Sequence, residues 1–187
     1  MEPNRRLSLA TAQKAVALDP NDAGTHWIYG VMLAQEHRWT EAEAELAVAL
    51  KLDPNNADAW ATASELMVLS GRPTEALADI QKALRLNPHP PSWYYWFLGQ
   101  AQYLNRQYER AIHTLRREET YRTVSRRILA ASLAQLGRLD EARQEAEMFM
   151  VSYPHFTIHQ WDQSQPFRDK AACQHFVDGY RKAGLPE

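Results

Sequence analysis

Cysteine is the scarcest residue in this sequence, because Cys173 is the only one among 187 residues. A lone cysteine cannot form an internal disulfide, and it cannot make a metal cluster by itself. The chain also lacks any apolar run of the ~18–20 residues that a membrane-spanning helix needs. At the amino end, Gln13 and Lys14 interrupt a mildly apolar stretch that would otherwise suit a secretion signal. We therefore expect a soluble, cytoplasmic protein without a membrane partner.

An excess of charge of one sign is lacking as well. Lysine and arginine number 21 against 23 aspartates and glutamates, which gives a net charge of −2. Nucleic-acid-binding domains usually show a basic excess, so the composition predicts no nucleic-acid partner. One local basic cluster exists: Arg116, Arg117, Arg122, Arg126 and Arg127. Because Glu118 and Glu119 interrupt it, we expect a solvated face or ion pairs within the protein, with contact to an acidic peptide or partner as the alternative.

Sequence motifs for catalysis are lacking too, since no Gly-rich phosphate loop, GxSxG elbow or HExxH appears. His155 and His159 are four apart, as in a metal pair on a helix, but no Glu or Cys nearby completes a site. Cys173 and His175 are two apart, so on a helix they point to different faces. The sequence therefore predicts no enzyme, no metal and no cofactor.

A repeat is the main feature that the sequence does contain. The tripeptide Leu-Asx-Pro occurs three times, and Pro20, Pro54 and Pro88 follow one another at intervals of 34 residues. A strict interval of this size is typical of a structural repeat. Within each interval, apolar residues recur at spacings of three and four in two successive stretches, which predicts two helices joined by a short turn.

Small residues occupy matched positions in these helices. The first helices carry Gly30, Ser64, Gly99 and Ala130, and the second helices carry Ala42, Ala76, Ala111 and Ala142. Two helices approach closely only where the facing side chains are small, and larger neighbours then fill the grooves. The pattern therefore predicts tightly packed helix pairs.

This combination resembles the tetratricopeptide repeat, and the segments LSGRPTEALADIQKALRLNP and LAQLGRLDEARQEAEMFM fit that family's pattern well. The resemblance covers roughly residues 5–154. It implies an all-α fold, in which antiparallel helix pairs stack into a right-handed solenoid with a capping helix at the carboxyl end. The chain departs from the pattern at His37 and Arg106, where the turn glycine is expected, and after the third repeat, where the exit proline is missing.

The expected organisation is one domain, 1–187, made of six segments. They are an orphan second helix at 5–22, repeats at 23–56, 57–90, 92–122 (irregular) and 123–156, and a capping segment at 157–187 that covers the last repeat. The orphan helix is either a natural cap or a sign that the chain is cut from a longer one, and we favour the second interpretation.

In this family the first helices line a concave surface that holds a partner. Projecting the repeat period onto that surface places these residues there: Trp27, Ile28, Val31, Ala61, Thr62, Glu65, Trp96, Gln100, Tyr103 and Arg127. Aromatic side chains make good anchors because they bring a large apolar area with few rotatable bonds. The alternative is that the aromatics pack against the terminal segment or a neighbouring subunit. The Lys and Asn residues that clamp a peptide carboxylate in one subtype are absent, so apolar contacts should dominate.

The resemblance thus implies a protein–protein interaction scaffold or regulatory module that binds a peptide or helix. The tail QPFRD…FVDGYRKAGLPE also resembles the end of bacterial tetratricopeptide regions fused to a nucleotide cyclase or a transcription activator domain. That likeness implies a bacterial signalling protein. The alternative function is a homodimerisation module for such an upstream effector domain.

Overall fold

The computed structural model describes residues 3–117, 120 and 122–187, and within them the backbone forms eleven helices and no strand. The helices are α1 (Pro3–Leu18), α2 (Ala23–Gln35), α3 (Trp39–Leu52), α4 (Ala57–Leu69), α5 (Pro73–Leu86), α6 (Ser92–Leu104), α7 (Tyr108–Leu115), α8 (Arg122–Gln135), α9 (Leu139–Ser152), α10 (Ile158–Ser164) and α11 (Lys170–Lys182). The fold is the predicted all-α solenoid.

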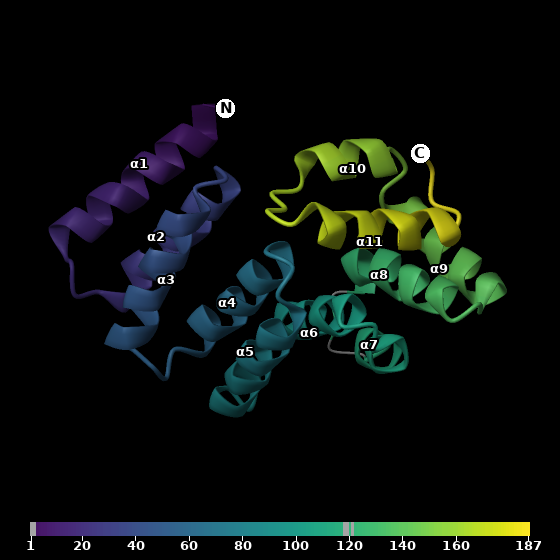
Figure 1. The fold of residues 1–187 in the computed structure, drawn as a ribbon, viewed down its shortest axis with the longest axis horizontal. Helices are drawn as coiled ribbons and strands as arrows, with labels where there is room; N and C mark the ends of the chain where they lie inside the picture. The colour runs from purple at the N-terminus through teal and green to yellow at the C-terminus, as the bar shows by residue number, and fades with distance from the viewer. Residues whose placement is uncertain (1–2, 118–119, 121) are drawn as a thin grey trace.

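Four helix pairs form the body of the molecule: α2 with α3, α4 with α5, α6 with α7, and α8 with α9. Each first helix also packs on the next first helix, and α1 packs against α2. Figure 1 shows the pairs arranged as an arc, with α5 and α7 on its outer side. We call the opposite side, towards which α4, α6 and α8 face, the inner face.

Close packing of small residues builds the pairs, as the sequence predicts. A Cβ atom on Gly30 would lie 3.1 Å from the carbonyl oxygen of Ala42, so a side chain there would press on the backbone of the neighbouring helix. Ala42, Ala76, Ala111 and Ala142 all have no exposed surface. The backbones can therefore approach each other at the matched positions.

The turns within the pairs share one conformation, whether or not they contain glycine. Gly71 and Gly137 have φ angles of 71° and 75°, and His37 and Arg106 adopt 59° and 58° in the equivalent places. The left-handed conformation costs a residue with a side chain about 1–2 kcal/mol, which the surrounding helix packing offsets. The missing glycines therefore leave the repeat intact.

The carboxyl-terminal segment packs on the last helix pair and extends beyond it. α11 lies along α8 of that pair and also reaches α6 and α4 on the inner face, where Figure 1 shows α10 and α11 above α8. The backbone N–H groups of Arg168 and Asp169 donate to the carbonyl oxygen of Leu69, at 3.0 and 3.2 Å. The Tyr103 hydroxyl donates to the carbonyl oxygen of His175 at 2.8 Å. These contacts tie the segment to α4 and α6 as well as to the last pair.

Candidate functional site on the inner face

Glu65, Trp96, Gln100 and Arg127 are the predicted residues that the structure leaves as candidates on the inner face. They come from α4, α6 and α8, which pack side by side, and all four side chains are half-buried. Glu65 lies one helical turn before Leu69, whose carbonyl oxygen holds the carboxyl-terminal segment, so the two residues share a side of α4.

Several polar atoms at this site have no partner in the part of the chain that the structure describes. The indole N–H of Trp96, the amide nitrogen of Gln100 and Nε of Arg127 are buried without a hydrogen-bond acceptor there. Leaving a buried donor unsatisfied costs about 1–3 kcal/mol, so most proteins avoid it. Three such atoms on adjacent helices favour a site that an acceptor from outside completes.

Glu65 adds an unpaired acid to these donors. Among the described residues it has no hydrogen bond or ion pair, and burial raises its pKa to about 7. An unpaired carboxyl group in a half-buried position is available to a donor or cation that a partner brings.

The carboxyl-terminal segment frames the site on one side. The Arg127 guanidinium lies 5.5 Å from the ring centre of Trp161 on α10 and 6.0 Å from that of Tyr180 on α11. Neither of these two aromatics is among the groove residues that the repeat period predicts. Apolar residues at helical spacing mark α10 and α11 as amphipathic. Only the return of the chain to the inner face, however, brings Trp161 and Tyr180 close to Arg127.

Three of the predicted groove assignments are wrong, because these residues are buried in the core. Ala61 and Tyr103 have no exposed surface, and Thr62 is 6% exposed. Ala61 packs in a cluster with Ile80 and Phe97 between α4, α5 and α6. Tyr103 stacks against His175 and Phe176 of α11, which agrees with the alternative that the aromatics pack against the terminal segment.

The residues predicted on α2 divide between two places. The Trp27 indole donates to the Thr62 hydroxyl at 2.8 Å, so this half-buried ring links α2 to α4. Ile28 is 49% exposed and lines a separate groove with α1, so its assignment to the inner face is wrong. Val31 is half-buried.

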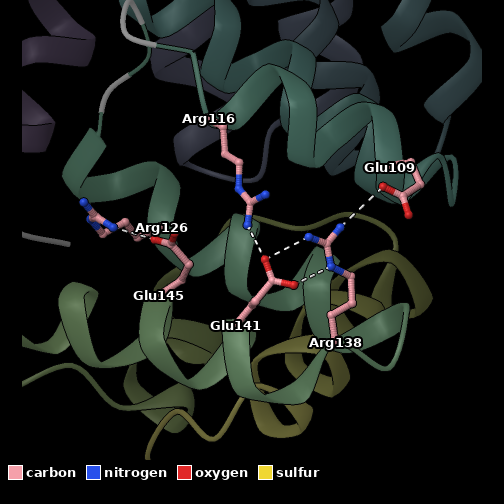
Figure 2. A network of polar contacts seen from close by, with 6 residues as sticks. All are labelled: Glu109, Arg116, Arg126, Arg138, Glu141 and Glu145. Carbon is pink, nitrogen blue, oxygen red and sulfur yellow. Dashed lines mark hydrogen bonds and ion pairs between the residues drawn. The ribbon is translucent and has the colours of Figure 1, made fainter.

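Two arginines of the cluster form ion pairs within the protein, as Figure 2 shows. Arg116 pairs with Glu141 at 2.8 Å and Arg126 pairs with Glu145 at 2.5 Å. Arg117 lies over the ring of Tyr95 at 4.5 Å. These contacts confirm the expected ion pairs for Arg116 and Arg126, whereas Glu118, Glu119 and the side chain of Arg122 lie outside the described residues.

Three other reactive side chains are held in structural contacts, those of Cys173, His175 and His159. The Cys173 thiol donates to Asp162 at 3.0 Å, and burial together with that carboxylate raises its pKa to about 12. His175 contacts the Tyr108 hydroxyl instead, and the His159 ring contacts Gln163. The described residues contain no group of three or more His, Cys, Asp or Glu side chains placed to hold a metal ion. None of the described helices is both long and apolar enough to cross a bilayer.

Comparison with known proteins gives family matches along most of the chain. Two tetratricopeptide-repeat models match residues 4–57 and 33–88, and the model for anaphase-promoting complex, cyclosome, subunit 3 matches residues 74–149. No curated protein sequence matches the chain.

Several solved structures share the fold. YrrB, described as a TPR protein with an unusual peptide-binding site, has 22% identity and a TM-score of 0.62 over 92% of each chain. PilF from Pseudomonas aeruginosa has 19% identity and a TM-score of 0.62, over 92% of this chain and 81% of that one. A chain of the APC/C hetero-tetramer Cut9–Hcn1 has 14% identity and a TM-score of 0.67, over 94% and 35%. At these identities the likeness concerns the fold alone.

Stacked helix pairs with a curved inner face define a helical-repeat solenoid, a class of protein that presents a surface to other proteins. The matches carry the assignment further: the chain belongs to the tetratricopeptide-repeat family. This fold supports a protein–protein interaction scaffold, and proteins of this kind are typically not enzymes.

Proposed function

We propose that the chain is an interaction scaffold that holds a peptide or helix of a partner protein against the inner face. The proposed setting is a bacterial signalling protein in the cytoplasm, as the resemblance of its tail implies. The observation that carries the binding proposal is the group of polar side chains on α4, α6 and α8 that have atoms without a partner among the described residues. YrrB, a structural neighbour, is described as having a peptide-binding site, which is consistent with this role.

Each residue of the site has a distinct role in this proposal. Trp96 supplies apolar area, and its indole N–H and the Gln100 amide donate to carbonyl oxygens of the bound segment. Glu65 and Arg127 carry opposite charges when Glu65 is ionised, and they lie on helices on either side of α6. They therefore orient the segment along the inner face, whereas Trp27 contributes through its ring and keeps its N–H on Thr62.

The test uses peptides selected from a random library on the wild-type chain. We expect Trp96→Ala to weaken the binding of those peptides by ~10-fold or more, because a buried aromatic anchor is typically worth above 1 kcal/mol. Trp60→Ala is the matched control, since Trp60 is also a half-buried indole on a first helix but donates to the carbonyl oxygen of Pro54. Circular dichroism establishes that both variants keep their helicity. Equal binding by wild type and Trp96→Ala, or a library that yields no binder, contradicts the proposal.

Self-association is a second candidate function, in which the module pairs two copies of an upstream effector domain. Exposed apolar side chains at the amino-terminal end of the solenoid favour it, among them Leu7 at 69% and Ile28 at 49% exposure. Sedimentation of the chain at increasing concentration tests it, and a monomer at the highest concentration contradicts it.

A further inference from the structure

A carboxyl group without a partner lies on the inner face, in the interior of the arc. It belongs to Glu65 on α4, which packs between α2 and α6. Its side chain is half-buried and makes no hydrogen bond or ion pair among the described residues. Unlike the side-chain nitrogens of Trp96 and Gln100, its oxygens are not fully buried. A donor that comes from another molecule can therefore contact this carboxyl group.

Two indole rings flank α4 next to Glu65. Trp27 on α2 donates to the hydroxyl of Thr62, three residues before Glu65, at 2.8 Å. Trp96 on α6 packs against the core cluster that contains Ala61, four residues before Glu65. Residues three and four apart share a side of a helix, so both half-buried rings lie near the turn that precedes Glu65. An acid beside aromatic rings is a favourable environment for a cation.

The helices that pack against α4 bring no counter-charge to Glu65. α6 contains no charged residue. His26 is the only residue of α2 that can carry a positive charge, and its ring is bonded to Glu45 of α3 at 2.5 Å. On α5, the carboxyl group of Asp79 has other charged neighbours, namely Arg72, Glu75 and Lys82.

The carboxyl-terminal segment brings a cation close to Glu65 but pairs it elsewhere. The backbone N–H of Arg168 donates to the carbonyl oxygen of Leu69, one turn after Glu65. Its guanidinium forms an ion pair with Glu43 on α3 at 3.2 Å. Burial is accordingly the only influence that shifts the pKa of Glu65, which it raises to about 7. The charge at this position has no counterpart among the described residues, and a cation would supply it.

We propose that the partner segment carries a lysine or arginine side chain that pairs with Glu65. This inference rests on the first proposed function and names the chemistry of the partner's contact residue. A neutral donor would leave the charge of a half-buried carboxylate uncompensated, whereas a cation compensates it. The apolar stem of a lysine or arginine suits the Trp27 and Trp96 rings. Arg127 on α8 repels the same side chain, so charge determines which part of the segment lies over α4.

This pairing makes binding depend on pH. A cation favours the ionised carboxylate, so the pKa of Glu65 is lower in the complex than in the free protein. With a pKa of about 7 in the free protein, about one-tenth of these carboxyl groups are ionised at pH 6 and about nine-tenths at pH 8. Binding therefore releases a proton over this range, and the affinity rises with pH. We expect an increase of at least ~5-fold between pH 6 and pH 8.

The probes are peptides selected at pH 8 on the wild-type chain from a random library that omits His, Asp and Glu. No side chain of such a peptide titrates between pH 6 and pH 8. We expect the binders to share a lysine or arginine at one position. Replacing it with norleucine should weaken binding to wild type by at least ~10-fold, because the pair loses one of its charges. Glu65→Gln should weaken binding of the original peptide by a similar factor at pH 8 and abolish the pH dependence.

Glu41→Gln is the matched control. Its side chain is 56% exposed on α3 and is paired with Arg38, so this variant loses the same charge without a change on the inner face. Its affinity and pH dependence should match those of wild type. The norleucine peptide should bind Glu65→Gln within about 2-fold of the original peptide, because the two changes remove the same contact. Circular dichroism at both pH values establishes that the variants keep their helicity.

The outcomes separate this contact from the scaffold function. A library that yields no binder overturns both proposals. Binders that Trp96→Ala weakens, but that share no basic residue or bind Glu65→Gln as tightly as wild type, overturn the cation contact and leave the scaffold standing. Equal weakening by Glu41→Gln would assign the attraction to net charge, and a pH dependence that persists in Glu65→Gln would assign it to another group. Either result overturns the pairing with Glu65.

Discussion

A single carboxyl group, that of Glu65, shows how the inner face differs from an ordinary protein surface. Its pKa is raised from 4.5 to about 7 because burial disfavours the charged form, and among the described residues no cation offsets this. The folded protein therefore binds a proton at Glu65 more tightly than the unfolded chain does. By linkage, this residue makes the free energy of unfolding fall as pH rises between about 4.5 and 7.

Glu65→Gln should remove this pH-dependent loss. We expect the variant to match wild type near pH 4.5 and to be more stable at pH 8 by about 1–3 kcal/mol, since each unit of pKa shift corresponds to about 1.4 kcal/mol and the side chain is only half-buried. Urea unfolding at the two pH values measures the difference. Glu41→Gln is the control, because its side chain is 56% exposed and paired with Arg38. A Glu65→Gln variant that is no more stable than wild type at pH 8 would show that a partner for the carboxylate exists in the folded chain.

A comparison of individual residues shows which parts of the site can be predicted from the sequence. Trp96 and Glu65 follow the repeat period on the first helices, and both are half-buried. Ala61 and Tyr103 follow the same period, yet they are buried. Periodicity gives the direction of a side chain from its own helix, but it contains no information about a segment that later covers it.

Among the elements, α11 has the largest effect on the site. It contacts α8 along its length and reaches α6 and α4, and the residues that make this possible are on its buried side. Gly179 is one of them: a Cβ atom there would collide with the Tyr103 hydroxyl and would lie 2.9 Å from Cβ of Ala131. The helix can lie this close to α6 and α8 because the position has no side chain.

Gly179→Ala should therefore destabilise the protein even though alanine favours helix. We expect a loss of about 1–3 kcal/mol, the usual range for an overpacked core site. Because one clashing atom is the Tyr103 hydroxyl, Gly179→Ala combined with Tyr103→Phe should lose less than the sum of the two single losses. Thermal or urea unfolding of the four proteins completes the cycle. Strict additivity would indicate that α11 does not pack on Tyr103.

At the scale of the whole molecule, the carboxyl-terminal segment changes how a repeat protein holds together. In a simple solenoid each repeat contacts only its neighbours, so stability is a sum of local contributions. Here the backbone at Arg168 and Asp169 is bonded to Leu69, about 100 residues earlier in the chain, and one core cluster includes residues from α4 to α11. The three later pairs and the segment should therefore unfold as one cooperative unit, whereas α1 to α3 are joined to it mainly by stacking and by the ion pair between Arg168 and Glu43 at 3.2 Å.

Phe176→Ala tests this division. Phe176 is 1% exposed in the shared cluster, and its loss should cost about 3–5 kcal/mol. Native-state hydrogen exchange should then show lowered protection in α4, α6 and α8 together, with α2 and α3 changed much less. Leu46→Ala on α3, which is 4% exposed, is the converse control and should affect α2 and α3 first. Equal loss of protection throughout the chain after either substitution would mean that the solenoid is a single unit.

The sequence by itself determined the repeat, the helix pairs and their close crossing points, because these depend on residues at most one period apart. For the arginine cluster it left a solvated face or internal ion pairs open, and the structure shows such pairs for Arg116 and Arg126. The tertiary structure alone decided that α11 returns to the inner face and that Tyr103 is buried. These features depend on contacts between segments that are distant in the sequence. A local pattern of small and apolar residues does not indicate which distant segment a helix will contact.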